Sequence, residues 1–538
     1  MKHRKSCIQW QELLAVSYPE EDLPPAECAA VEKHVAACAE CAALRKQYRA
    51  MTTYFRARSA VQPLPSSTFR YPHLLVEVAQ REHVEPVEQP YRLEPRYLTP
   101  SHSFSRVINH GLALISVIGI ILAGLLLFLP LEGRNNSSSR PGDPLHRHGS
   151  DVAKGTPHCE STATNDAELK AGVQNVVPGQ TLCLLPGIYN MRFGPGAIVI
   201  PSGTASQPVT ITGYDPTAGG LPDAAHRPVI RPQIQGVQDV LLLQDAHDIV
   251  IDSLDLDGSS DGTSHKVAHD IVKLSDSTNI VIRNSELAWG LSGGLQTAGQ
   301  SDQNQFLNLR VHDNGTDANG AGISIETSSN IVDHCDVYNN RGNGITIWGS
   351  GGKLYPARSN NVVKNTRIHG NKAADGSGGA GIEIGSDPGS PRNYNNTFYN
   401  NIVYENFYGG IWIADPTNTK VYNNTIYHNQ GGGANIPGLY ITSRAINIDV
   451  QNNISVQNGN DGTKNYTLGY EQRNIASDPG FASVDPTSPN FLHLTDHTAP
   501  QGAHLEEVRA DADGGCRPSG MDDMGAYEFG STPGQCST

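Results

Sequence analysis

A short alternation of apolar and polar residues recurs through the second half of the chain, from about residue 240 to residue 458. In each instance a glycine precedes two apolar residues that flank a third residue, and the clearest instances are Gly322-Ile323-Ser324-Ile325, Gly344-Ile345-Thr346-Ile347, Gly381-Ile382-Glu383-Ile384, Gly410-Ile411-Trp412-Ile413 and Gly438-Leu439-Tyr440-Ile441. Alternation over three or four residues predicts short strands that turn one row of side chains toward a core.

Asn-rich corners accompany these strands and end at Asn314, Asn340, Asn371, Asn406, Asn429 and Asn458. Successive corners lie 26, 31, 35, 23 and 29 residues apart, a spacing that suits a strand solenoid whose insertions fall in loops. Many β-branched residues favour stacked parallel strands, and Asn both tolerates a left-handed backbone and can form side-chain ladders. The pattern therefore predicts a right-handed parallel β-helix.

A second apolar signal lies upstream, at residues 107–131, where twenty-five residues contain no Asp, Glu, Lys or Arg. At about 1.5 Å rise per residue, such a helix exceeds the roughly 30 Å of a bilayer core. About a hundred residues precede it, which argues against a cleaved signal peptide. We expect a single transmembrane helix, so the protein would span the cell membrane.

Charge separates the two sides of this helix. Residues 1–106 carry 14 basic against 12 acidic residues, whereas residues 132–538 carry 25 against 42, a net charge of −17. An acidic C-terminal part argues against a direct nucleic-acid partner.

The N-terminal segment contains a metal-binding pattern. His34 and Cys38 are four residues apart in a helix-forming stretch, and Cys41 follows one turn later. These three side chains share one helical face, and three soft ligands need one more to complete tetrahedral zinc. The alternative is that they are ordinary helix residues, with His34 at the surface.

With Cys7 upstream, the segment resembles the zinc-binding anti-sigma factor domain of bacterial membrane-anchored regulators, over roughly residues 1–60. The resemblance implies that Cys7 is the fourth zinc ligand and that the partner is a sigma factor. Cys28 is extra, and is either an alternative ligand or a redox partner. Reduced thiolates imply a cytoplasmic N-terminus, and therefore an extracytoplasmic β-helix.

Residues 61–106 and 132–158 are rich in Pro, Arg, Ser or Glu without periodicity, and we expect both to be flexible linkers. From residue 159 to residue 530 the chain resembles the pectate-lyase-like superfamily of β-helices. A short helix at residues 166–176 would cap the first coil, and the stretch from Asp513 to Glu528 resembles a closing signature that orders the last coil. Cys159 with Cys183, and Cys516 with Cys536, are candidate disulfides, and Cys335 is expected to be a buried thiol.

In that superfamily, polysaccharide lies along one sheet. Aligning the coils on their corner Asn residues places outward side chains of that sheet in one column, namely Lys273, Ser324, Thr346, Glu383, Trp412 and Tyr440, with Glu326 and Trp348 in a second column. Trp348, Trp412 and Tyr440 offer flat faces for stacking on sugars, which predicts a carbohydrate-binding surface, although exposed aromatic side chains could instead pack under a loop.

Two kinds of catalysis are conceivable on this face. A lyase needs a base, for which Lys273 is the candidate, beside Ca²⁺ held by carboxylates such as Asp257, Asp261 and Asp270. A hydrolase needs two carboxylates, for which Glu326 and Glu383 are the candidates, two coils or roughly 9–10 Å apart. A charged residue on a solvated face often has neither role.

Three functions are consistent with this organisation. The favoured one is a membrane-anchored regulator whose zinc domain holds a sigma factor while the β-helix binds or senses a cell-envelope glycan. The alternatives are a membrane-tethered polysaccharide lyase or glycoside hydrolase with a regulatory zinc domain, and a β-helix that acts as a structural spacer.

Overall fold

The computed structural model describes residues 156–538, apart from residues 234–236, 263–264, 317–319, 351–356, 374–377, 388, 431–435, 460–469, 473, 475–477, 496–500, 519, 533–535 and 537–538. The expected zinc domain at 1–60, the linker at 61–106 and the transmembrane run at 107–131 lie outside these residues. So does the linker at 132–158, except for its last three residues. No helix within the described part of the chain is long and apolar enough to cross a bilayer.

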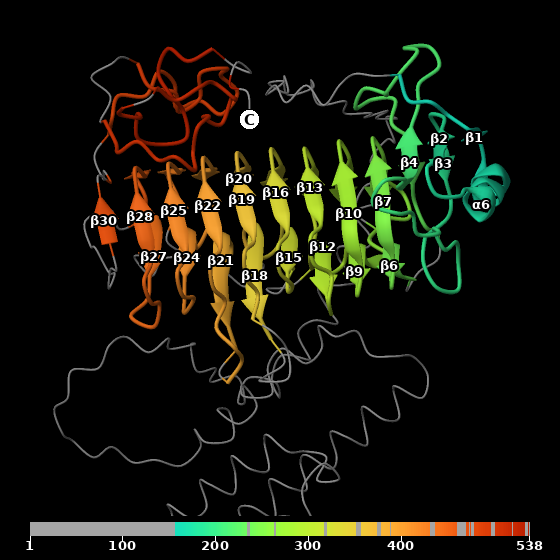
Figure 1. Ribbon diagram of the computed structural model, residues 1–538, viewed down its shortest axis with the longest axis horizontal. Coiled ribbons are helices and arrows are strands. Elements are labelled where there is room, and N and C mark those ends of the chain that lie inside the picture. Colours follow the sequence, from blue (N-terminus) through green and yellow to red (C-terminus); the bar gives the residue numbers. More distant parts are fainter. Residues whose placement is uncertain are drawn as a thin grey trace, which may run out of the picture. The chain divides into compact units, whose positions relative to one another are not determined.

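The described strands form three parallel sheets that the chain visits in turn, and their neighbours within each sheet come from successive coils (Figure 1). We name them sheets A, B and C. Sheet A contains β1 (Ser161–Ala163), β2 (Thr181–Leu184), β4 (Val209–Gly213), β7 (His247–Asp252), β10 (Thr278–Arg283), β13 (Gln305–Leu307), β16 (Ile331–Asp333), β19 (Val362–Lys364), β22 (Thr397–Tyr399), β25 (Lys420–Tyr422), β28 (Asp449–Gln451) and β30 (Tyr470–Gln472).

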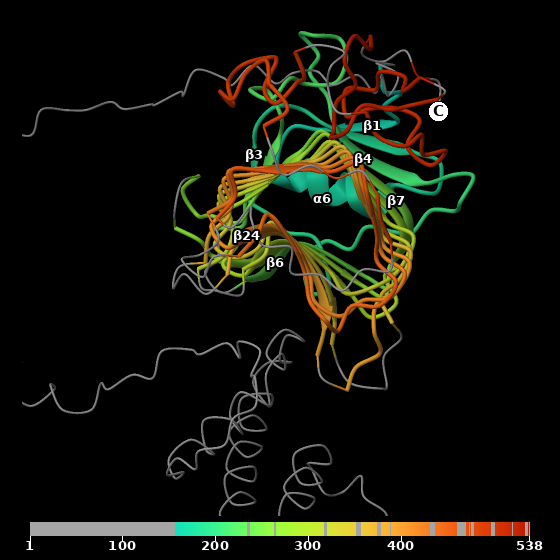
Figure 2. The ribbon, with the colours of Figure 1, turned by 90° about the vertical axis from the view of Figure 1, so that its left-hand side faces the viewer.

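Sheet B contains β3 (Ile188–Tyr189), β5 (Val229–Ile230), β8 (Asp255–Asp257), β11 (Glu286–Ala288), β14 (Arg310–His312), β17 (Asp336–Tyr338), β20 (Arg367–His369), β23 (Ile402–Tyr404), β26 (Thr425–Tyr427) and β29 (Ile454–Val456). Sheet C contains β6 (Val237–Gln244), β9 (Ala268–Ser275), β12 (Gly293–Ala298), β15 (Ile323–Ile325), β18 (Ile345–Gly349), β21 (Ala380–Ser386), β24 (Gly409–Ile413) and β27 (Leu439–Ile441). Figure 2 looks along the stack and shows the strands of the three sheets arranged around its long axis. The predicted parallel β-helix is confirmed.

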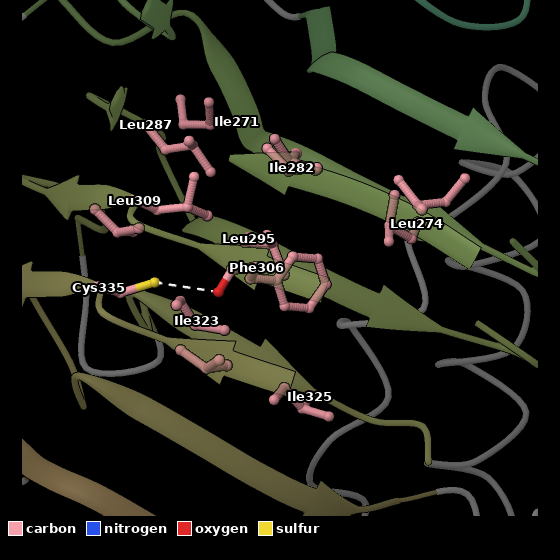
Figure 3. Packing of buried hydrophobic residues seen from close by; sticks show 14 of the residues in the cluster. Ile271, Leu274, Ile282, Leu287, Leu295, Phe306, Leu309, Ile323, Ile325 and Cys335 are labelled. Carbon is pink, nitrogen blue, oxygen red and sulfur yellow. Dashed lines mark hydrogen bonds between the residues drawn. The ribbon is translucent and has the colours of Figure 1, made fainter. Parts of the chain in front are cut away.

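The core consists of inward-facing Ile, Leu, Val and Phe side chains stacked coil upon coil. Ile323, Ile345, Ile382 and Ile411 form one such row along sheet C, and each is at most 1% exposed. Cys335 belongs to the same core, as expected, and its thiol donates a hydrogen bond to the Phe306 carbonyl oxygen at 3.4 Å (Figure 3).

The corner between sheets B and C is held by a ladder of buried asparagines, the six that the sequence pattern singled out. Asn371 shows the bonding: its Oδ1 accepts hydrogen bonds from the backbone N and Nδ2 of Asn340, and its Nδ2 donates to Val337 O and to Asn406 Oδ1. The amide of each coil therefore fixes the next coil at one register. Shorter ladders occupy the other two corners, for example Asn330–Asn361–Asn396 and Asn401–Asn424–Asn453.

We expected the ladder asparagines to adopt the left-handed backbone conformation. At the B–C corner, the residue immediately before each ladder asparagine adopts it instead. The residues with positive φ precede the ladder asparagines and are chemically diverse, being Asp313, Asn339, Gly370, Glu405, His428 and Gln457. Asn is therefore selected at the ladder positions for its side-chain hydrogen bonds. Asparagines do adopt the left-handed backbone conformation at the A–B corner, where Asn308, Asn365 and Asn400 have φ between 50° and 55°.

The glycine at the start of the sheet C strands from β12 to β27 is explained by close packing at the same corner. A Cβ at Gly344 would lie 2.4 Å from Ile368 Cγ2 and 2.9 Å from the ladder amide of Asn371. No larger residue fits there without displacing the core or the ladder.

The first coil of the described stack is covered at its end. At the first coil lies helix α6 (Asp166–Asn175), capped by Asn165 and packed through Leu169 and Val173. The predicted helix is confirmed, and the Cys159–Cys183 disulfide lies beside it.

The stretch that was expected to order the last coil belongs to a C-terminal segment that packs instead on sheet B. Phe491, Met524 and Tyr527 pack with Tyr404 and Tyr427 of sheet B. Cys516 and Cys536, expected as a second disulfide, are separate thiols in the structure, which corrects that expectation.

We predict that the B–C ladder is a main source of stability. Asn371→Ala leaves buried backbone and side-chain partners unsatisfied, so it should lower the free energy of unfolding by about 2–4 kcal/mol. Asn190→Ala, which removes an exposed amide, should change it by less than about 0.5 kcal/mol. Urea unfolding of the full chain measures both, and equal midpoints for the two variants would refute the ladder's role.

Candidate functional site

The outer face of sheet C carries the side chains that the sequence placed in one column. Strand pairing puts them in register in the order Leu242, Lys273, Gln296, Ser324, Thr346, Glu383, Trp412 and Tyr440. The predicted register is therefore confirmed, and the roles assigned to these residues stay predictions. Gln296 was absent from the predicted column, because its coil has Thr297 where the repeating pattern has a second apolar residue. Thr297 is buried, and its hydroxyl is hydrogen-bonded to that of Thr327.

The middle of this column is not open. Gln296, Ser324 and Thr346 are only 5–7% exposed, whereas Lys273, Glu383, Trp412 and Tyr440 are half-buried. The face thus presents two separate accessible regions, one near Lys273 and one from β21 to β27.

The region from β21 to β27 is aromatic. The Trp412 ring stacks on Tyr408 with centroids 5.2 Å apart and meets the tilted ring of Tyr440 at 5.8 Å. Trp348, in the second column, packs against Gly385 and donates from Nε1 to Asp387 Oδ1 at 2.9 Å. Each indole and phenol is held by a neighbour, so the rings are positioned before any ligand arrives, with those of Trp412 and Tyr440 tilted by 57° to one another.

The two carboxylates considered for hydrolysis are both fixed by neutral donors. Glu326 accepts hydrogen bonds from Gln296 Nε2 and Ser350 Oγ, each at 3.0 Å, and Glu383 accepts one from Asn343 Nδ2. Glu326 follows β15 and Glu383 lies in β21, two strands further, or roughly 10 Å along the stack. Glu326 is nearly buried, which leaves Glu383 as the more accessible of the two.

The Lys273 region contains a compact polar cluster of Asp239, His269 and Asp270. One ligand atom from each lies within 4.8 Å of the others, and Asp270 N donates to Asp239 Oδ1 at 3.3 Å. Burial, and then the charge of Asp270, raise the pKa of Asp239 to about 7, with Lys273 and His269 opposing the shift. A hydrogen bond to Asp270 raises the pKa of His269 despite its burial.

Sequence reasoning named Asp270 near Lys273 but missed Asp239 and His269. Asp239 lies one coil earlier, and only the pairing of β6 with β9 brings it beside Asp270. Asp257 and Asp261 do not join the cluster, because Asp257 pairs with Arg231 and Asp261 with His265.

The cluster fits calcium poorly. Ca²⁺ takes six to eight oxygen ligands, whereas the described side chains here supply two carboxylates, one imidazole and a nearby ammonium group. The described side chains therefore do not form a calcium site at this position.

The proposed zinc ligands Cys7, His34, Cys38 and Cys41 lie outside the described residues, so their arrangement stays a prediction.

Comparisons with known proteins bear on both parts of the chain. Residues 258–359 and 355–474 match the family model described as "Right handed beta helix region", and residues 7–42 match the model described as "Putative zinc-finger". No curated protein matches the chain.

Among solved structures, pectate lyase Pel9A superimposes with a TM-score of 0.51 at 14% identity, covering 70% of this chain and 98% of its own. A rhamnogalacturonan lyase gives 0.41 at 15% identity, covering 62% and 96% of the two chains. The A-module of the Azotobacter vinelandii mannuronan C-5 epimerase AlgE4 gives 0.38 at 17% identity, covering 57% and 86%. At these identities the likeness to Pel9A establishes the fold alone.

Proposed function

We propose that this protein is a membrane-anchored regulator whose β-helix binds a polysaccharide on sheet C and whose N-terminal zinc domain binds a sigma factor. Glycan binding is supported by the aromatic surface from β21 to β27, where Trp412 and Tyr440 lie in register with Glu383. Aromatic rings stack on the apolar faces of sugars, and a fixed carboxylate accepts hydrogen bonds from hydroxyl groups.

The regulatory half is supported by the zinc-finger match at residues 7–42, which includes all four proposed ligands. Cys7, His34, Cys38 and Cys41 would hold Zn²⁺ in a closed tetrahedral site, and a closed site stabilises the surrounding helices rather than performing chemistry. Binding of a sigma factor by those helices is the function that the family resemblance implies.

In this proposal, a transmembrane helix connects the zinc domain to the β-helix. Residues 107–131 would cross the cell membrane, with thiolate ligands on the reducing cytoplasmic side. The Cys159–Cys183 disulfide suits the oxidising side, where we place the β-helix.

A second candidate, polysaccharide lyase activity, is favoured by the cluster around Lys273. A lyase base removes a proton next to a uronate carboxylate, and we assign that role to Lys273, which lies near the buried Asp239, whose pKa is raised to about 7 by burial and by the charge of Asp270. Hydrolysis by Glu326 and Glu383 has less support, because Glu326 is nearly buried.

We predict that glycan binding depends on Trp412. On a glycan array, Trp412→Ala in the full chain should weaken binding by about tenfold, since it removes the central stacking ring. Tyr394→Ala is the matched control, because Tyr394 is an exposed aromatic residue outside sheet C.

Equal binding by the two variants would exclude the aromatic surface as the glycan site. Release of unsaturated products from any array glycan, lost in Lys273→Ala but kept in Trp412→Ala, would establish the lyase instead.

We predict that the N-terminal domain co-purifies with a sigma factor and with zinc. His34→Ala should lose both, because three ligands hold the metal too weakly to order the domain. His73→Ala, a histidine outside residues 7–42, is the control. Mass spectrometry of the purified complex and metal analysis give the readouts, and a sigma factor retained by the zinc-free variant would contradict the proposal.

A further inference from the structure

Basic residues follow the asparagine ladder at the B–C corner and are stacked in register. The residue after each ladder asparagine donates its backbone N–H to the ladder asparagine of the preceding coil. Arg341 N donates to Asn314 O at 2.7 Å, and Lys372 N donates to Asn340 O at 2.9 Å. Arg341 and Lys372 therefore occupy equivalent positions in successive coils, which lie about 4.8 Å apart in a parallel stack.

The neighbouring coils extend this arrangement in both directions. One coil before Arg341 the position is Gly315, where a Cβ would lie 3.2 Å from Arg341 Cβ. Lys266 places its charge at that coil, because its Nζ donates to Gly315 O at 2.6 Å. One coil after Lys372 the position is Phe407, whose ring centroid lies 4.4 Å from Lys372 Nζ. A cation over an aromatic ring keeps its charge.

We define the cationic row as Lys266, Arg341 and Lys372. Arg341 and Lys372 are exposed, and Lys266 is half-buried. Within the described residues, none of the three forms a salt bridge with a carboxylate. Asp313 lies near Lys266, but its Oδ2 is paired with His312 Nδ1 at 2.9 Å.

The members of the row act on one another electrostatically. Burial, and then the charge of Arg341, lower the pKa of Lys266 to about 8, with Asp313 opposing the shift. Like charges held this close would be stabilised by an anion bound between them. The row is thus a local concentration of positive charge, although residues 132–538 carry a net charge of −17.

We propose that the cationic row binds the acidic groups of a linear glycan. Its charges follow the coil repeat, and an extended chain of pyranose sugars running along the stack would present successive groups at a similar spacing. Ammonium and guanidinium groups form charge-assisted hydrogen bonds with carboxylate and with phosphate oxygens, so either acidic group fits. The inference goes beyond the proposed function, because it places a second site outside sheet C that does not depend on Trp412.

The charge distribution favours a glycan over a nucleic acid. Salt screens charges over about 8 Å at physiological ionic strength, so a group seated on the row is attracted mainly by these three cations. Proteins that bind nucleic acids present larger basic surfaces and are commonly basic overall. A row of three cations on an acidic domain suits a polymer of lower charge density.

Binding of the full chain, purified in mild detergent, to immobilised polymers tests the proposal by biolayer interferometry. Polygalacturonate offers carboxylates, poly(glycerol phosphate) offers phosphates, and methyl-esterified polygalacturonan is the neutral reference. In about 0.05 M NaCl, the apparent Kd for at least one anionic polymer should be about tenfold lower than for the neutral one, and it should rise as salt is added. The anionic polymer that binds more tightly identifies the acidic group.

The double variant Arg341→Gln/Lys372→Gln should raise the apparent Kd for that polymer by about tenfold, because an exposed ion pair contributes up to about fivefold. The control Lys170→Gln/Arg444→Gln removes the same charge from exposed positions in α6 and in a C–A connection, and should change the Kd by less than about twofold. If the first double variant folds poorly, Arg341→Gln alone should raise the Kd by about threefold.

Equal affinities of the two double variants, or no binding of either anionic polymer by the unaltered protein, would overturn the inference. So would tighter binding of single-stranded DNA than of both anionic glycans. The proposed function fails separately, because it rests on array binding that is lost in Trp412→Ala, a variant that should keep the binding due to the cationic row.

Discussion

The structure depends on the coils being held in one register by buried amide ladders. In a solenoid each coil contacts only its neighbours, so any slip of one strand would displace every side chain beyond it. The bonds of Asn371 to Asn340 and Asn406 prevent such a slip at the B–C corner. Sheet C begins directly after this corner, and the alignment of Glu383, Trp412 and Tyr440 follows from it.

The ladder also explains why loops can vary without disturbing the surface. Corner spacings range from 23 to 35 residues, yet the strands of sheet C pair without offset. Extra residues leave the coil between strands and do not alter the stacking. A binding surface on sheet C can therefore keep its geometry while its surrounding connections differ in length.

Much of this architecture could be predicted from the sequence, because the relevant constraints are local. Gly344 and Asn371 mark a corner that leaves no room for a Cβ and requires a side-chain amide, and both signals are visible in single residues. Helix α6 could be predicted from its cap and its apolar spacing for the same reason.

The features that could not be predicted depend on contacts between residues far apart in the sequence. Asp239 joins Asp270 only because their coils stack, 31 residues apart in the chain. The C-terminal segment is fixed to the A–B corner by Arg517, which is buried with Glu528 and also donates to Asn400, 117 residues away. Burial raises the pKa of Glu528 to about 7, with Arg517 opposing the shift. No periodic pattern signals such contacts.

The proposed function requires the glycan surface and the zinc domain to lie on opposite sides of one membrane. Labelling of intact cells with a membrane-impermeant maleimide, mapped by peptide mass spectrometry, tests this most directly. Ala482→Cys, at an exposed position after the β-helix strands, should be labelled in intact cells, whereas Ser59→Cys should be labelled only after permeabilisation. Equal labelling of both cysteines in intact cells, or of neither, would contradict the arrangement.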